Sequence, residues 1–251
     1  KGAGVYTRVD SLGVGTHTLT FVADATYFRF LAHAGATATI DNISVKDITF
    51  STDVDLARIN YDSNGANGHI LLEPTSTNLI PYSEDFSQWI TNNATITSTL
   101  QTAPDGSAYV DKYVGSTTSQ DLKNTSASVE GTFTYSVFVK YINAPYIRLR
   151  AESISTWFNV QNGTIETNNF DDASIQSFGN GWYRISVTNT TSATTFNDFY
   201  IHPHSINNTT GEQDGGSFYV WGAQVEALSY ATSYIPNHGT AVGITRATET
   251  L

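Results

Sequence analysis

The 251-residue chain contains neither cysteine nor methionine. Without cysteine it can form no disulfide framework, no thiolate nucleophile and no cysteine-ligated zinc site. Methionine is missing even at position 1. We therefore expect that the chain has lost its start or is a segment of a longer protein.

Basic residues and long apolar runs are scarce as well. Lysine and arginine number 12 against 23 aspartates and glutamates, which gives a formal net charge of −11. A chain of this charge repels the phosphate backbone of nucleic acids, so we expect no nucleic-acid partner. No run of about 18 apolar residues is present, so we expect no membrane insertion. The amino terminus also lacks the basic and apolar segments of a signal peptide.

Apolar residues at helical spacing are missing from all long stretches of the sequence. Instead Val, Ile, Thr, Tyr and Phe recur in short alternating runs, separated by 19 glycines, 6 prolines and many Asn, Ser and Thr residues. Alternation with a period of two is typical of strands, and the separating residues are typical of tight turns. The sequence therefore predicts an all-β fold, and its 39% hydrophobic content is enough for at least one full core.

The strand pattern divides the sequence into four parts. Residues 1–48 have the pattern of the C-terminal part of an upstream β-sandwich, because they contain alternating runs but no opening half. Residues 49–80 are rich in Asp, Asn and Gly and are expected to be a connector. Residues 81–236 are expected to form a complete sandwich, and residues 237–251 a C-terminal extension. The expected strands of the complete sandwich are residues 94–101, 108–114, 132–141, 145–151, 157–160, 173–178, 182–188, 196–203 and 217–226.

Four stretches give the sequence from residue 71 onward a resemblance to a known family. They are LEP, TNL and YSEDF within residues 72–86 followed by Trp89, then APDG at 103–106, GWYR at 181–184, and WGAQVE at 221–226 running on to SYIP at 233–236. In order and spacing these resemble the carbohydrate-binding-like, concanavalin-like jelly-roll domains of phage tail-fibre and other virion proteins. Residues 40–46 resemble the final strand of a related jelly-roll that often precedes this one.

The resemblance implies a jelly-roll β-sandwich and a place in a virion tail, fibre or other surface appendage. It further implies contacts with other virion or tail proteins and, because fibres need interchain contacts to be stiff, a homotrimer. Members of the family differ in ligand, so the resemblance indicates the fold more strongly than the function.

Two predicted strands display side chains suited to sugar recognition, which uses aromatic faces together with short polar groups or arginine. Within residues 145–150 and 199–204 the polar side chains share one parity and apolar ones the other. If the two strands share a face, they form a cationic and aromatic patch that suits an acidic glycan. Its members would be Tyr146, Arg148, Arg150, Tyr200, His202 and His204, with Trp157 as an added stacking platform.

The same residues allow a plainer interpretation. Arg148 and Arg150 could form ordinary salt bridges with the abundant carboxylates, and the histidines could simply be solvated. Trp157 could equally belong to the core, because tryptophan is often largely buried. The remaining three tryptophans alternate with strand residues and are expected in the core: Trp89, Trp182 and Trp221.

Few residues suggest metal binding or catalysis. Jelly-rolls often hold a structural calcium at the sheet edge through carboxylates, and Glu84, Asp85 and Glu226 are the candidates here. No other cofactor is expected. Carboxylates such as Asp105 and Glu152 lie at scattered positions with no nucleophile and base arranged around them. We therefore expect no catalytic residues and no enzymatic activity.

Together these patterns predict a phage tail-fibre or virion surface module that binds host-surface glycan in adhesion or receptor recognition. Two alternatives remain open. The chain could be the carbohydrate-binding module of a secreted, extracellular polysaccharide-degrading enzyme. It could also be a purely structural spacer or decoration domain of a virion.

Overall fold

The computed structural model describes residues 58–61, 68–116, 120–196, 198–205 and 216–248. The chain divides into two compact units, residues 1–50 and 51–251, and every described residue belongs to the second unit. The predicted upstream sandwich at residues 1–48 therefore lies outside the described residues, as does part of the predicted connector.

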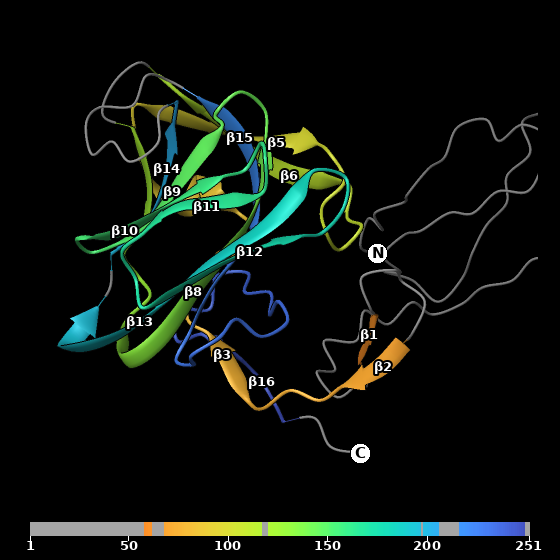
Figure 1. Ribbon diagram of the computed structural model, residues 1–251, viewed down its shortest axis with the longest axis vertical. Coiled ribbons are helices and arrows are strands. Elements are labelled where there is room, and N and C mark those ends of the chain that lie inside the picture. Colours follow the sequence, from red (N-terminus) through yellow and green to blue (C-terminus); the bar gives the residue numbers. More distant parts are fainter. Residues whose placement is uncertain (1–57, 62–67, 117–119, 197, 206–215, 249–251) are drawn as a thin grey trace, which may run out of the picture. The chain divides into compact units, whose positions relative to one another are not determined.

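Two six-stranded antiparallel sheets stack to form the body of the fold (Figure 1). We call the first the β9 sheet; its strand order is β11 (Thr164–Asn168), β10 (Ile154–Asn159), β9 (Tyr146–Ala151), β14 (Phe199–His204), β7 (Asp121–Asn124) and β4 (Ile90–Asn92). We call the second the β8 sheet; its order is β12 (Asp172–Ser177), β13 (Trp182–Phe196), β8 (Val129–Tyr141), β15 (Ser217–Glu226), β6 (Tyr109–Gly115) and β5 (Ala94–Leu100).

Successive strands cross from one sheet to the other at the centre of the fold. Strands β6, β7, β8 and β9 alternate between the β8 sheet and the β9 sheet, and so do β13, β14 and β15. Such alternation is the topology of a jelly-roll, which is built from Greek-key connections. The predicted all-β jelly-roll sandwich is thereby confirmed for the described strands β4 to β15.

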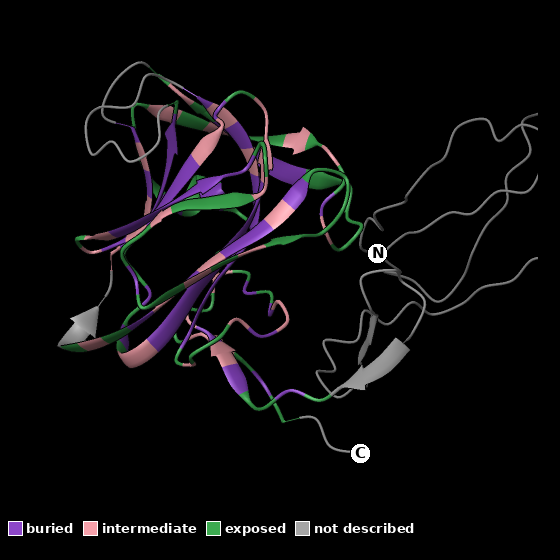
Figure 2. Ribbon diagram, viewed as in Figure 1, coloured by how far each residue is buried: buried purple, intermediate pink, exposed green. Residues whose placement is uncertain are grey.

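The core lies between the two sheets and follows from alternation along their central strands. On β8, Phe133, Val137 and Val139 are fully buried, and Ile147 and Leu149 on β9 belong to the same apolar cluster. Because side chains in a strand point alternately to opposite faces, one apolar parity from each sheet is enough to build this core. Figure 2 shows the result, with buried central strands and largely exposed outer strands such as β11 and β12.

Short elements accompany the sandwich. Strand β3 (Ser76–Asn78) pairs antiparallel with β16 (Ile244–Arg246), and β1 (Arg58–Tyr61) pairs with β2 (Gly68–Leu71). The 3-10 turn η1 (Phe86–Gln88) is capped by the carboxylate of Asp85, which accepts from the backbone N–H of Ser87. In the part of the chain that the structure describes, no helix is long and apolar enough to cross a membrane.

The four stretches that carry the family resemblance meet at the β8 sheet. Asn78 donates from its side-chain amide to the carbonyls of Ala223, at 3.1 Å, and Ile235, at 2.8 Å. The indole N–H of Trp182 donates to the carbonyl of Thr102 at 2.9 Å. Each of these bonds joins segments that are far apart in the sequence. The resemblance therefore rests largely on residues that tie loops to the sandwich.

Buried tryptophans stabilise this arrangement, as predicted. Trp89 lies in the main core. Trp182 and Trp221 pack with Phe138 in a second apolar cluster, which lies on the other side of the β8 sheet from the main core. Their burial places these three indoles in structural roles.

Candidate functional site

All seven residues predicted to bind glycan lie on the outer face of the β9 sheet. Their strand neighbours Ile147, Leu149 and Ile201 point into the core, so side chains of the other parity point away from it. Strands β9 and β14 pair directly, as do β9 and β10. We call this set the outer polar face: Tyr146, Arg148, Arg150, Trp157, Tyr200, His202 and His204.

The register aligns three of these residues in one row across three strands. Arg148 on β9 lies opposite His202 on β14 and, on its other side, opposite Trp157 on β10. The guanidinium carbon of Arg148 is 5.5 Å from the centre of the Trp157 ring system, within the range of a cation–π interaction. We call this the central row.

A second row runs beside it. Arg150 lies opposite Tyr200, with its guanidinium carbon 4.3 Å from the ring centre, and the ammonium of Lys123 on β7 lies 5.2 Å from the same ring. The Tyr200 hydroxyl donates to Asp198 at 3.1 Å, and Lys123 pairs with the same carboxylate oxygen at 3.7 Å. The ring of Tyr200 also stacks on His202, with ring centres 5.3 Å apart.

The face is more deeply buried than an open sugar platform. Trp157 is 2% exposed, Tyr200 8%, His202 4% and His204 3%. Only Tyr146 and Arg150 are half-buried. The rings of the predicted patch therefore do not offer open faces for stacking, and the interpretation of the histidines as solvated side chains is wrong.

The central row contains three buried polar atoms without a hydrogen-bond partner: Nε of Arg148, Nε1 of Trp157 and Nε2 of His202. Two other indole N–H groups do have hydrogen-bond partners: Trp89 donates to the carbonyl of Tyr82, and Trp182 donates to the carbonyl of Thr102. Buried polar groups in native proteins are paired in the large majority of cases. Three unpaired atoms in one row therefore mark a place where a further group, either an ordered water or a ligand atom, is needed.

The protonation of His202 follows from its partner. Its Nδ1 lies 3.1 Å from the backbone carbonyl of Gln120, and a carbonyl can only accept. Nδ1 therefore carries the proton. Burial, together with the nearby Arg148 charge, lowers the pKa of His202 well below its ordinary value, so the ring is neutral at pH 7. Its unpaired Nε2 is consequently an acceptor in the same row as the two unpaired N–H donors of Arg148 and Trp157.

This burial makes stability depend on pH. The unfolded chain takes up a proton at His202 near pH 6.5, whereas the folded chain does not, so stability falls as the pH drops below that value. We expect His202→Gln to reduce the loss of unfolding free energy between pH 7.5 and pH 5.5 by about 1 kcal/mol. Urea unfolding of the wild type and the variant at the two pH values measures this difference in unfolding free energy. The exposed His238→Gln serves as the control, and an equal effect there would contradict the assignment.

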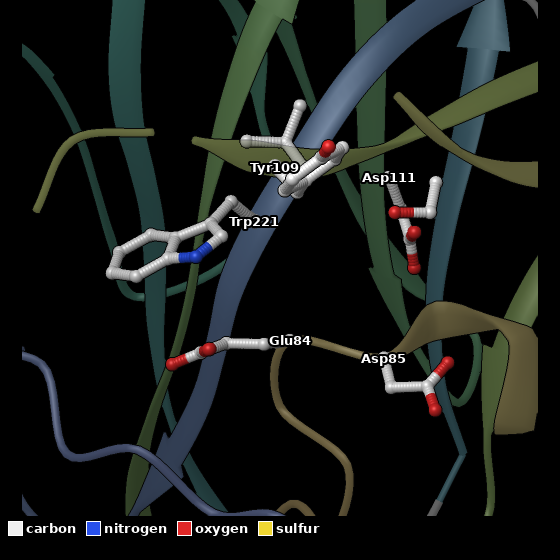
Figure 3. Close-up of a pocket in the computed structure, with 7 residues that line it drawn as sticks. Glu84, Asp85, Tyr109, Asp111 and Trp221 are labelled. Atoms are coloured by element: carbon white, nitrogen blue, oxygen red, sulfur yellow. The ribbon is translucent and has the colours of Figure 1, made fainter. Parts of the chain in front are cut away.

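The three carboxylates predicted to hold calcium do not come together. Glu84 and Asp85 line a cavity of about 320 Å³ with Tyr109, Asp111 and Trp221, but their side chains point in different directions (Figure 3). Glu84 accepts from the hydroxyl of Tyr234 at 3.0 Å. Burial raises the pKa of both Glu84 and Asp111.

Glu226 lies elsewhere and is already engaged. It is fully buried and accepts hydrogen bonds from Ser76 and from the backbone N–H and side chain of Thr232. Across the described ranges, no group of three or more histidines, aspartates and glutamates has an arrangement that could hold a metal ion.

Sequence reasoning missed several contributors to the outer polar face. Lys123 and the carbonyl of Gln120 come from β7 and the residue before it, where no strand was expected. Asp198 lies just before β14. The alternation of Asp121, Leu122, Lys123 and Asn124 is the only sequence signal for β7, and it is shorter than most strands.

No protein-family model matches the chain, and no curated protein matches it. Several solved structures are similar to part of it, and three of them are described here. The CBM22-1–GH10 modules of endo-1,4-beta-D-xylanase 10B from Clostridium thermocellum, complexed with xylohexaose, are 13% identical with a TM-score of 0.39; the match covers 66% of this chain and 30% of that one. The chain thus spans less than a third of that structure.

The other two are smaller. The CBM22-1 xylan-binding domain from Paenibacillus barcinonensis is 12% identical, with a TM-score of 0.36 over 62% of this chain and 94% of that one. A carbohydrate-binding module from Cellvibrio mixtus lichenase 5A, in complex with cellotriose, is 11% identical, with a TM-score of 0.33 over 63% and 99%.

Proposed function

We propose that this chain is a non-catalytic glycan-binding module and that sugar binds to the outer polar face of the β9 sheet. The observation that carries the proposal is the central row, in which two N–H donors and one acceptor lie buried without partners. A sugar hydroxyl both donates and accepts, so hydroxyl groups can satisfy all three atoms at once.

The dimensions of the row suit such a ligand. Neighbouring strands lie about 4.8 Å apart, so a row across three strands reaches about 10 Å, enough for a short oligosaccharide. The row stands on paired strands of a packed sheet, and its three unpaired atoms are buried, so the side chains that cover them have to move for a sugar to reach these atoms.

The setting of the module is a separate question. A place in a virion tail or fibre, a homotrimer and adhesion to a host-surface glycan are supported by the sequence resemblance alone. A carbohydrate-binding module of a secreted enzyme would use the same face in the same way. The burial of the Trp157 and Tyr200 rings favours a third candidate, a structural spacer that binds no glycan.

Binding of the purified chain to a panel of neutral and acidic polysaccharides, measured by affinity electrophoresis and calorimetry, separates the two glycan-binding candidates from the spacer. Trp157→Phe keeps an aromatic ring, breaks no hydrogen bond within the protein and removes one unpaired donor. We expect it to weaken glycan binding about fivefold, the equivalent of one hydrogen bond of about 1 kcal/mol.

Trp182→Phe is the matched control. It removes an indole N–H that is already bonded to Thr102, behind the other sheet. It should lower stability and leave glycan affinity unchanged. A folded wild-type chain that binds no polysaccharide of the panel would refute the proposal and support the spacer.

A further inference from the structure

The charge of Arg148 has no counter-ion among the residues that the structure describes. Arg148 is 6% exposed. Ion pairs in this part of the chain join Lys123 to Asp198 and Arg246 to Glu73, and neither reaches it. Its guanidinium carbon lies 5.5 Å from the centre of the Trp157 ring system, which carries no charge. Removing a cation from water without pairing it is strongly unfavourable, so an uncompensated buried arginine needs an explanation.

The guanidinium remains charged despite this environment. Burial, and after it the neighbouring Arg150, lower the pKa of Arg148 to about 10, which is still well above neutral pH. Arg148 therefore stays protonated at pH 7, and its charge remains unpaired. Among the described residues, none supplies the anion that would neutralise it.

The surroundings strengthen the positive potential. Arg150 and Lys123 lie in the adjacent row on either side of Tyr200. The carboxylate of Asp198 is occupied by Lys123 and the Tyr200 hydroxyl. On the same strand as Lys123, Asp121 accepts through Oδ2 from the side chain of Asn92 at 3.2 Å, and its Oδ1 is buried without a partner. A concentration of three cations stands out on a chain whose formal net charge is −11.

His202 adds a different requirement directly beside the cation. Because Nδ1 donates to the Gln120 carbonyl, the Nε2 atom can only accept. An anionic group alone cannot satisfy it, since an anion has no proton to give. A ligand that satisfies the central row therefore has an anionic group for Arg148 and, next to it, a hydroxyl group that donates to His202.

We infer that the outer polar face selects acidic sugars: a carboxylate or sulfate pairs with Arg148 while a neighbouring hydroxyl of the same glycan donates to His202. This inference rests on the proposed function, because it names the class of glycan that the same face binds. Charge-assisted hydrogen bonds to a carboxylate or sulfate are stronger than those to a neutral hydroxyl, so the preference for acidic sugars is large.

The test compares polymers that differ only in charge. Polygalacturonate and hyaluronate are titrated beside their carboxyl-reduced forms, and dextran sulfate beside dextran, in 0.15 M salt. We expect at least tenfold tighter binding to the acidic member of a pair. The two sets of polymers separate carboxylate from sulfate recognition. In Arg148→Gln the preference should disappear, whereas Lys112→Ala, which removes a cation on the β8 sheet, should retain it.

The outcomes distinguish this inference from the proposed function. Equal binding of charged and uncharged members would overturn the acidic preference and leave glycan binding intact. An acidic preference that survives in Arg148→Gln would also overturn it, because residues other than Arg148 would then bind the acidic group of the glycan. Binding to no member of any pair, by a chain shown to be folded, would overturn both.

Discussion

Replacing Glu226 by alanine is expected to lower the free energy of unfolding by about 3–5 kcal/mol, because it breaks a buried network of charge and hydrogen bonds. Glu226 accepts from Ser76 and Thr232, and its negative charge supports the buried guanidinium of Arg184. Arg184 in turn donates to the carbonyl of Thr232 at 2.6 Å and to the hydroxyl of Ser136 at 3.0 Å. Without Glu226, its charge is poorly compensated.

Urea unfolding followed by tryptophan fluorescence measures this effect. Glu226→Gln, which keeps an acceptor but removes the charge, should fall between the wild type and the alanine variant. Glu130→Ala removes an exposed carboxylate from β8 and should change the free energy by less than about 0.5 kcal/mol. A loss below about 1 kcal/mol for Glu226→Ala would show that the network does not stabilise the sandwich.

The substitution Arg148→Met should act in the opposite direction and raise the free energy of unfolding by about 1–4 kcal/mol. Replacing buried charged groups by apolar side chains of similar volume is often stabilising, and here no protein partner is left behind. Residues that are retained for function often lower stability, because the site requires a side chain that does not stabilise the fold.

The comparison variant is Arg150→Met, on the same strand and the same face. Arg150 is only half-buried and donates to the backbone carbonyl of Glu152, so its loss should not stabilise the chain. Denaturation midpoints and slopes of the two variants are measured side by side. If Arg148→Met were destabilising, the arginine would have a structural role, and its unpaired charge would need another account.

All nine strands predicted for the complete sandwich are present, eight of them with boundaries within three residues, whereas β13 continues eight residues beyond the predicted end at residue 188. Their alternation is strong because one face of each packs in the core, and that is the signal that a sequence carries best. Strands β4, β7 and β11 were missed. Each is three to five residues long and polar, so neighbouring strands rather than local preference place it in the sheet.

For the candidate site, parity predicted correctly which side chains share the outer face of β9 and β14. The pairing of Arg148 with both His202 and Trp157 could not be predicted, because it depends on which strands are neighbours and in what register. Burial was not predictable for the same reason. Parity does not apply to Glu84 and Asp85, which lie in a loop before η1, so their position relative to Glu226 on β15 could not be predicted.

The pairing of β3 with β16 also determines how this unit responds to tension. Ser76 lies opposite Arg246 and Asn78 opposite Ile244, in antiparallel register. Force applied to the chain on either side of this pair pulls Ser76 and Arg246 apart from the same end, so the pair opens one residue at a time. Opening therefore begins at Ser76, whose hydrogen bond to the buried carboxylate of Glu226 has to break with the first step.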